Sequence, residues 1–245
     1  MRDRAADAAA EAILLAGGAR AILLQLAHPA VGRGVAEHSD FAERPLGRLH
    51  GTLTYLYVIR FGTPEEAASI ARHVGAAHRP VVGEGYDARD VALQVWVAAT
   101  IHDTAVRMHE LVLGPADEQE LLDEAAIVAT TLGVPRSEWP ATPEAFAEYW
   151  GGVPLRVEQP ARDVAQALLH PATGPLWMRA LMPTVRLVTA GLLDDDLREA
   201  YGLPLDARKF ERLVRVARAV YPRLPRFIRH APMRRYLREF RRGRG

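Results

Sequence analysis

The amino-acid sequence predicts an all-α fold, in which a single-domain bundle of many helices packs around one long buried central helix. Ala, Leu, Arg and Glu dominate the 245 residues, and these residues favour helices. Patterns typical of strands are nearly absent, and the β-branched stretch at residues 80–82 is too short to count as one. Hydrophobic residues make up 49% and charged residues 25%, a globular balance that argues against disorder. We therefore expect residues 1–245 to form one domain.

Start and stop signals divide the chain into helices. Thr63, Pro64 and Glu66 have the spacing of a capping box with proline in the first turn. Gly133 and Gly202, each followed two residues later by proline, mark helix ends. The expected helices cover residues 5–27, 44–60, 64–78, 88–113, 117–132, 143–150, 160–170, 176–192, 194–201, 206–220 and 225–242.

The longest expected helix is the most informative one. Its apolar residues between 91 and 113 cover more than one face, which indicates a central, largely buried helix. Ala98, His102, Ala105, His109 and Val112 follow a spacing of three and four residues and therefore share one stripe. A histidine beside small alanines leaves room for a flat group. The simpler interpretation is a hydrogen-bonded histidine of the core.

Several kinds of chemistry are excluded or poorly supported. There is no cysteine, so a thiol nucleophile and a Cys-ligated metal are excluded. Lys209 is the only lysine and follows no glycine-rich loop, which argues against Schiff-base and P-loop chemistry. His38, Ser39 and Asp40 are adjacent and cannot align as a catalytic triad. The histidine spacings do not predict a zinc site, and no catalytic residue is assigned.

The charges are distributed unevenly along the chain. The tail, residues 223–245, holds nine arginines and one acid, Glu239, which leaves 22 basic and 29 acidic residues elsewhere. We interpret it as a partly disordered terminus that pairs with the acidic body, with weak contact to a membrane surface as the alternative. No nucleic-acid-binding motif is present, so no nucleic-acid partner is expected. The apolar stretch at 12–26 is interrupted by Arg20 and is too short for a membrane span, so we expect a cytoplasmic protein.

A series of short motifs between about residues 14 and 150 resembles one known family. The matching elements are Gln25-Leu26-Ala27-His28-Pro29, His38-Ser39-Asp40-Phe41, Arg48-x-x-x-Thr52, Phe61-Gly62-Thr63, His78-x-x-Val81-x-Gly83, Tyr86-x-Ala88-x-Asp90, Trp96-Val97 through Asp103, and Gly133-Val134-Pro135. Together they resemble the haem-dependent oxygenase family of MpaB-type oxygenases and rubber oxygenase (latex-clearing protein). The resemblance implies an all-α fold around haem b, an axial histidine on the central helix, and oxidative cleavage of carbon–carbon double bonds with O₂.

The central helix departs from the family pattern at the axial position. The family has Trp-Val-His-Ala-Thr, whereas Ala98 stands here at the position of the histidine. His102 follows one turn later, about 40° round the helix and about 6 Å along it. Three alternatives stay open: His102 replaces the family ligand, another histidine such as His28 or His78 does so, or the pocket holds no haem.

The resemblance gives Arg48 and Thr52 a supporting role, in which they would hold haem propionates or shape the pocket. Rubber cleavage is not expected, because the lysine that precedes the matching threonine in that branch is Gly51 here. We expect a haem b-binding oxygenase that uses O₂ or peroxide on a small apolar substrate, with a redox partner as a further option. The alternative is a haem-free helical protein that binds a small ligand on the same fold.

Overall fold

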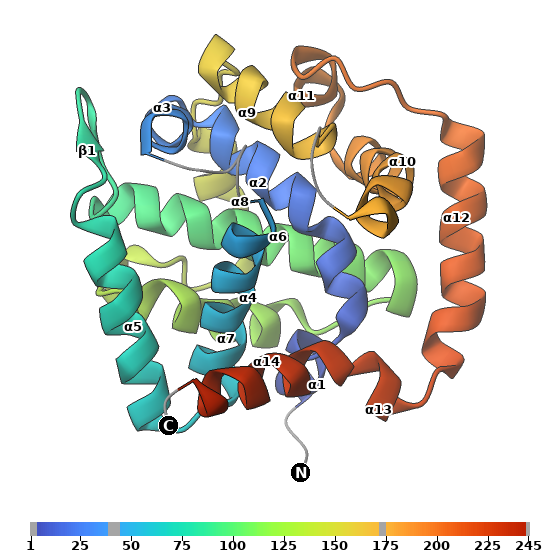
Figure 1. Cartoon of the computed structure of the whole chain (residues 1–245), viewed down its shortest axis with the longest axis horizontal. Helices are drawn as coiled ribbons and strands as arrows, with labels where there is room; N and C mark the ends of the chain where they lie inside the picture. Colours follow the sequence, from blue (N-terminus) through green and yellow to red (C-terminus); the bar gives the residue numbers. More distant parts are fainter. Residues whose placement is uncertain (1–3, 39–44, 172–174, 244–245) are drawn as a thin grey trace.

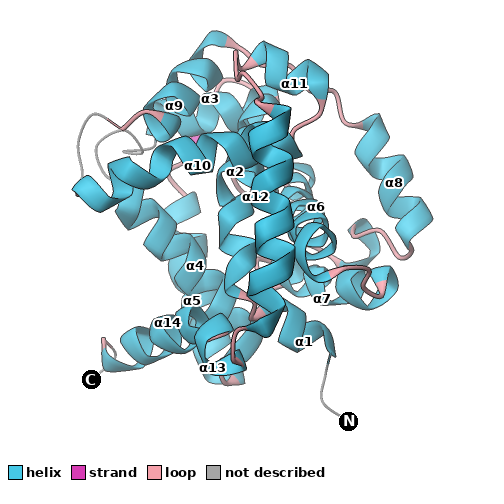
Figure 2. Ribbon diagram, turned by 90° about the vertical axis from the view of Figure 1, so that its right-hand side faces the viewer, coloured by secondary structure: helices cyan, strands magenta, loops and turns pink. Residues whose placement is uncertain are grey.

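The computed structural model describes residues 4–38, 45–171 and 175–243, apart from the side chains of residues 4–6, 45, 46 and 48. Within these residues helices predominate, in agreement with the predicted all-α class (Figures 1 and 2). The α-helices are α1 (Arg4–Ala9), α2 (Gly18–Ala27), α3 (Pro29–His38), α4 (Pro45–Phe61), α5 (Pro64–His78), α6 (Val91–Leu113), α7 (Glu118–Thr130), α8 (Pro143–Gly152), α9 (Gln159–Leu169), α10 (Leu176–Leu192), α11 (Asp195–Ala200), α12 (Ala207–Val220), α13 (Arg226–Arg229) and α14 (Ala231–Arg242). The 3-10 helices are η1 (Ala12–Gly17), η2 (Arg136–Glu138) and η3 (Tyr221–Arg223).

Helix α6 lies at the centre of the molecule, as the sequence predicted (Figure 1). It begins where the Asp90 carboxylate accepts a hydrogen bond from the Ala92 amide, and it continues for 23 residues. Helices α2, α7 and α12 and the 3-10 helix η1 pack against it. Because neighbours surround it, α6 buries residues on more than one face, and it forms the floor on which the candidate site is built.

The local start and stop signals are confirmed. Thr63 and Glu66 form both hydrogen bonds of the capping box at α5, and Thr142 caps α8. Gly133 and Gly202 follow α7 and α11 with φ of 103° and 63°, in the left-handed region that glycine favours. These features depend on a few neighbouring residues, which is why sequence spacing alone located them.

The N-terminal region differs from the single helix expected at residues 5–27. It is divided into α1, η1 and α2, and the break lies at Glu11, whose backbone is extended. The Glu11 carboxylate is buried, accepts a hydrogen bond from the Tyr221 hydroxyl at 2.7 Å and pairs with Arg229 at 3.0 Å. These partners come from the far end of the chain. A tertiary contact therefore sets the break and overrides the local helix preference.

Helix α3 was not predicted, and neither was the short hairpin between α5 and α6. α3 begins directly after α2, and the two segments are bent by 106°. The hairpin pairs β1 (Val82–Gly83) with antiparallel β2 (Tyr86–Asp87). The last residue of the stretch at 80–82, Val82, therefore lies in a strand of two residues. Glu84 and Gly85 form the turn between them, and the φ of Gly85 is 76°.

Among the described residues, no single helix is long and apolar enough to cross a membrane. Residues 12–27 and 29–38 are together long and apolar enough to cross one, although the chain bends sharply between the two segments. Much of α2 is buried against α6 and α9, which is the pattern of a core helix in this fold.

The α2–α3 corner offers a test of backbone packing. A Cβ on Gly32 would lie 2.6 Å from the carbonyl oxygen of Leu26, so backbone would have to move. We expect Gly32→Ala to lower the free energy of unfolding by about 1–3 kcal/mol, the usual cost of overpacking.

The matched control is Gly75→Ala in α5, where a Cβ would meet nothing within 4 Å. The control should be neutral or stabilising by up to about 1 kcal/mol, because alanine favours helices. Equal effects of the two changes in denaturant unfolding would contradict this account of the corner.

The arginine-rich tail is helical and is tied to the body of the molecule. α14 packs against α4 and also contacts η1, and Figure 1 shows it crossing in front of α1. Arg229 pairs with Glu11, and Arg241 pairs with Glu66 at 2.9 Å. Arg226 pairs with Asp7. The expected pairing with acidic groups is therefore present, whereas the described part, up to residue 243, is a folded pair of helices and not a disordered terminus.

Candidate functional site

A largely apolar cavity of about 310 Å³ lies beside the central helix. Its walls come from α1, η1, α2, α4, α6 and α7, and α3 contributes Val35. Most lining residues are aliphatic, and the polar ones include Gln25, Thr52, Thr104, His102 and His109. Arg60 and Glu124 also line it and form an ion pair with each other, which balances their charges. The cavity thus suits an apolar molecule or group that meets a small number of polar atoms.

The predicted stripe on α6 faces this cavity over most of its length. Ala98, His102, Ala105 and His109 all line the cavity, whereas Val112 is buried in a neighbouring cluster. The structure therefore places Ala98 and His102, one turn apart, on the same wall. Because Ala98 and Ala105 have short side chains, the space in front of this wall stays open.

His102 is buried between the cavity and two aromatic rings. Its ring meets Phe146 edge-on at a centroid distance of 4.8 Å and Trp139 at 6.2 Å. Burial lowers the pKa of His102 to about 4, so the imidazole is neutral near pH 7. Within the described part of the chain, neither ring nitrogen forms a hydrogen bond. The interpretation as a hydrogen-bonded core histidine therefore does not describe its surroundings.

The other predicted site residues are placed differently. Thr52 lines the cavity at an exposed position on α4, and the side chain of Arg48 lies outside the described residues. His28 ends α2, its ring faces Trp96 at 6.3 Å, and it does not line the cavity. His78 lines a separate surface depression with Arg72 and Arg79. Of the three histidines considered as ligands, only His102 lies on the cavity.

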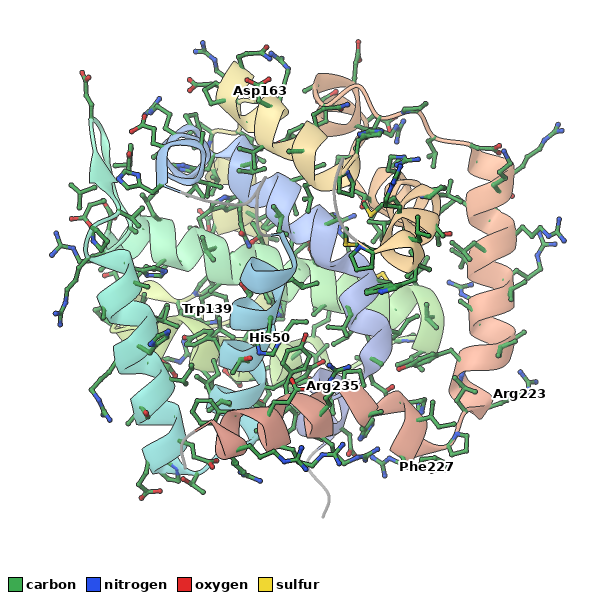
Figure 3. All side chains as sticks on the ribbon, in the orientation of Figure 1. His50, Trp139, Asp163, Arg223, Phe227 and Arg235 are labelled. Atoms are coloured by element: carbon green, nitrogen blue, oxygen red, sulfur yellow. The ribbon has the colours of Figure 1, made fainter. Side chains whose placement is uncertain are left out.

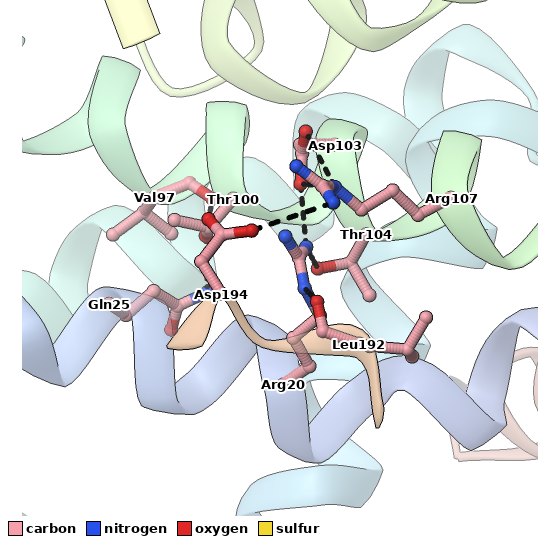
Figure 4. Close-up of polar contacts among 9 residues, drawn as sticks. All are labelled: Arg20, Gln25, Val97, Thr100, Asp103, Thr104, Arg107, Leu192 and Asp194. Carbon is pink, nitrogen blue, oxygen red and sulfur yellow. Dashed lines mark hydrogen bonds and ion pairs between the residues drawn. The ribbon is translucent and has the colours of Figure 1, made fainter. Parts of the chain in front are cut away.

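A buried polar network holds α2 against α6, and sequence reasoning missed it (Figure 4). Arg20 is fully buried, pairs through Nη1 with the Asp103 carboxylate at 2.6 Å, and donates to the Thr104 hydroxyl at 2.8 Å. Its Nε donates to the Leu192 carbonyl, which ties in the end of α10. Desolvation lowers the pKa of Arg20, and the charge of Asp103 opposes this effect. The sequence indicated this network only through Arg20, a charged residue inside the apolar stretch at 12–26.

A second link joins the same two helices closer to the cavity. The Gln25 amide donates to the Thr100 hydroxyl at 3.0 Å, and that hydroxyl donates to the Val97 carbonyl. Gln25 and Thr104 line the cavity, whereas Thr100 is fully buried behind it. The network therefore fixes the position of one cavity wall relative to the other.

The donor set bears on which metal or cofactor could bind. Among the described residues, no three His, Cys, Asp or Glu side chains gather in a way that could hold a metal ion by themselves. A cofactor that brings most of its own ligands needs only one protein donor. A neutral imidazole on an apolar cavity meets that need, so the residues present fit a haem better than a bare ion.

Comparison with known proteins identifies the family. The sequence matches the family described as "ER-bound oxygenase mpaB/B'/Rubber oxygenase, catalytic domain" over residues 6–219. The chain belongs to this family. The match to the mpaB/rubber oxygenase catalytic domain covers α2, α4, α6 and α7, which form the cavity, and it ends within α12. The resemblance that the sequence motifs indicated is thereby confirmed, and it extends well beyond residue 150.

Two relatives of this mpaB/rubber oxygenase chain come from mycobacteria. They are the uncharacterized proteins Mb2261 of Mycobacterium bovis and Rv2237 of Mycobacterium tuberculosis. Each is 33% identical over 215 residues, which span 80% of this chain and 84% of the relative. No solved structure matches the chain.

Proposed function

We propose that the protein is an oxygenase that binds haem b in the cavity through His102 and oxidises a small apolar substrate with O₂ or peroxide. Membership of the mpaB/rubber oxygenase family supports oxygenase chemistry. The observation that carries the finer assignment is the environment of His102. His102 is buried and neutral near pH 7, it makes no hydrogen bond with the residues that the structure describes, and it lies on the wall of an apolar cavity.

Each part of the cavity has a role in this proposal. A ring nitrogen of His102 would be the protein's ligand, and the methyl group of Ala98 would leave space beside it. Bound haem supplies the activation of O₂ or peroxide. The aliphatic walls exclude water and accept an apolar substrate, and Thr52 offers a hydroxyl at the exposed end of the cavity. The role of Arg48 at a propionate stays a prediction from sequence.

Titration of the purified protein with hemin tests the proposal. We expect a saturable Soret band at one hemin per chain, and a shift of that band when the reduced protein is exposed to carbon monoxide. The shift requires an exchangeable coordination position, which oxygen chemistry also requires. A linear, unsaturated absorbance change, identical to that of hemin in buffer, would contradict haem binding.

The position of Ala98 gives a sharper test, because a histidine there restores the family pattern. In the double variant Ala98→His/His102→Ala the imidazole moves one turn along α6 but stays on the same cavity wall. We expect the double variant to bind hemin with an affinity within about tenfold of the unmodified protein, whereas His102→Ala alone does not bind it. Both variants are compared by Soret titration. Failure of the double variant, while its helical circular dichroism is retained, would show that this wall does not hold the haem.

The alternative function is that of a haem-free protein that binds a small apolar ligand. Ala98 at the family's axial position favours it, because alanine cannot bind iron. This alternative predicts a colourless protein whose spectrum hemin does not change, but whose cavity takes up an apolar fluorescent dye. Displacement of the dye by hemin would instead support the haem site.

A further inference from the structure

The N-terminal half of α10 carries large apolar side chains that face solvent. Leu176 is 80% exposed, Trp177 is 61% exposed and Leu181 is 53% exposed. The C-terminal half of the same helix is buried against α2, η1 and α12. Neighbouring exposed apolar side chains on a single-chain protein usually mark a surface that meets a partner or a membrane.

The cavity reaches the surface on the same side of the molecule as this helix end. Two of its lining residues on α4, Leu49 and Thr52, are exposed, and Leu49 is 42% exposed. Figures 1 and 2 show that the N-terminal ends of α4 and α10 project from the same side of the molecule, which faces the viewer in Figure 1 and lies to the left in Figure 2. The exposed side chains of α10 therefore lie on the side where the cavity opens.

Positive charge predominates on this side. Neither residues 45–61 nor residues 176–192 include an aspartate or glutamate, and Arg179 is exposed among the apolar side chains of α10. α14 packs against α4 and presents Arg234 and Arg238 to solvent, whereas Arg235, which lies near His50 of α4 in Figure 3, pairs with Glu239. Exposed apolar groups beside arginines are the composition that binds an anionic lipid surface. A second copy of the chain would place like charges against each other.

We propose that this side docks on an anionic membrane surface, through a mouth face formed by Leu49, Leu176, Trp177, Arg179 and Leu181. The apolar side chains enter the boundary between lipid headgroups and acyl chains, and the arginine meets the headgroup phosphates. The cavity then opens toward the lipid, so that an apolar molecule can pass from the membrane to the α6 wall without crossing water. The docking depends on surface residues alone and does not require the haem.

The arginine-rich tail is a poorer candidate for the main contact. Arg226, Arg229 and Arg241 form ion pairs with Asp7, Glu11 and Glu66 and are therefore already partly neutralised. Another exposed apolar group lies on α12 and α13 and includes Val216, Val220 and Phe227. None of these three residues lines the cavity, so this group serves as the matched control.

The protein carries its own probe for the docking. Trp177 is the exposed tryptophan, whereas Trp96 and Trp139 are buried and Trp150 is half-buried. We expect vesicles of equal parts phosphatidylcholine and phosphatidylglycerol to sediment the full-length protein. We also expect them to shift its tryptophan emission to shorter wavelength and to protect it from quenching by acrylamide. Vesicles of phosphatidylcholine alone should bind less than the mixed vesicles by about tenfold or more.

Substitutions then locate the contact. Leu176→Ser/Leu181→Ser should weaken partitioning by about tenfold or more, and Arg179→Gln should weaken it by about fivefold on anionic vesicles only. The control Val216→Ser/Val220→Ser should leave partitioning unchanged. All these side chains are exposed, so circular dichroism should be unaltered.

Absence of sedimentation, equal binding to both kinds of vesicle, or loss in the control alone would overturn the proposal. So would a concentration-dependent dimer in analytical ultracentrifugation that Leu176→Ser/Leu181→Ser abolishes. A protein that binds hemin but no vesicles would contradict the membrane docking and would leave the proposed function unaffected.

Discussion

Replacing His102 with leucine is expected to lower hemin affinity by about 100-fold or more while the protein stays folded. The reason is that leucine fills most of the same volume against Phe146 and Trp139 but offers no nitrogen to iron. Even residues that only support a metal ligand commonly change affinity by about 10- to 100-fold, so the ligand itself should change it at least as much. Because the His102 ring makes no hydrogen bond in the described part of the chain, its removal leaves no buried polar partner unsatisfied.

The control for His102→Leu is His109→Leu on the same helix and the same cavity wall. The His109 ring meets the Gly114 carbonyl at 3.1 Å, so one of its nitrogens already has a partner at the end of α6. We expect the His109 variant to retain the Soret band and its response to carbon monoxide. Full hemin occupancy in the His102 variant, or equal loss in both variants, would show that His102 is not the ligand.

Asp103→Asn is expected to have the largest effect on stability. It removes the negative charge that faces the fully buried guanidinium of Arg20 at 2.6 Å. Breaking a buried pair by removing one partner costs about 3–5 kcal/mol, because the remaining charge stays buried without compensation. The change should appear as a lower midpoint of denaturant unfolding, with the slope of the transition unchanged.

A surface ion pair with the same distance provides the comparison. Arg89 and Asp87 also lie 2.6 Å apart, but their side chains are 57% and 34% exposed. Asp87→Asn is expected to leave the midpoint of unfolding nearly unchanged, since water solvates the remaining charge. Similar losses for Asp103→Asn and Asp87→Asn would contradict the view that burial of Arg20 determines the effect.

The fold was predictable where local chemistry decides it. Thr63, Asp117 and Gly133 begin or end helices through contacts with residues a few positions away, so their spacing is legible in the sequence. The break at Glu11 and the corner at Gly32 depend instead on Tyr221 and on a close backbone approach. Such partners meet only after the chain has folded, and local helix preference then predicts one helix where there are several pieces.

The candidate site was also predictable only in part. Helical periodicity placed Ala98, His102 and His109 on one stripe, and the structure shows that this stripe lines the cavity. Periodicity could not show that Arg20 meets Asp103 and the Leu192 carbonyl, because these partners lie far from it along the chain. Nor could it separate the three histidines, since only tertiary structure places His28 and His78 away from the cavity.

A crystal structure of the protein grown with hemin tests the central claim most directly. We expect a haem in the α6 cavity, with iron within bonding distance of a ring nitrogen of His102 and with Ala98 beside the macrocycle. Iron bound to His28, to His78 or to no residue of this cavity would contradict it.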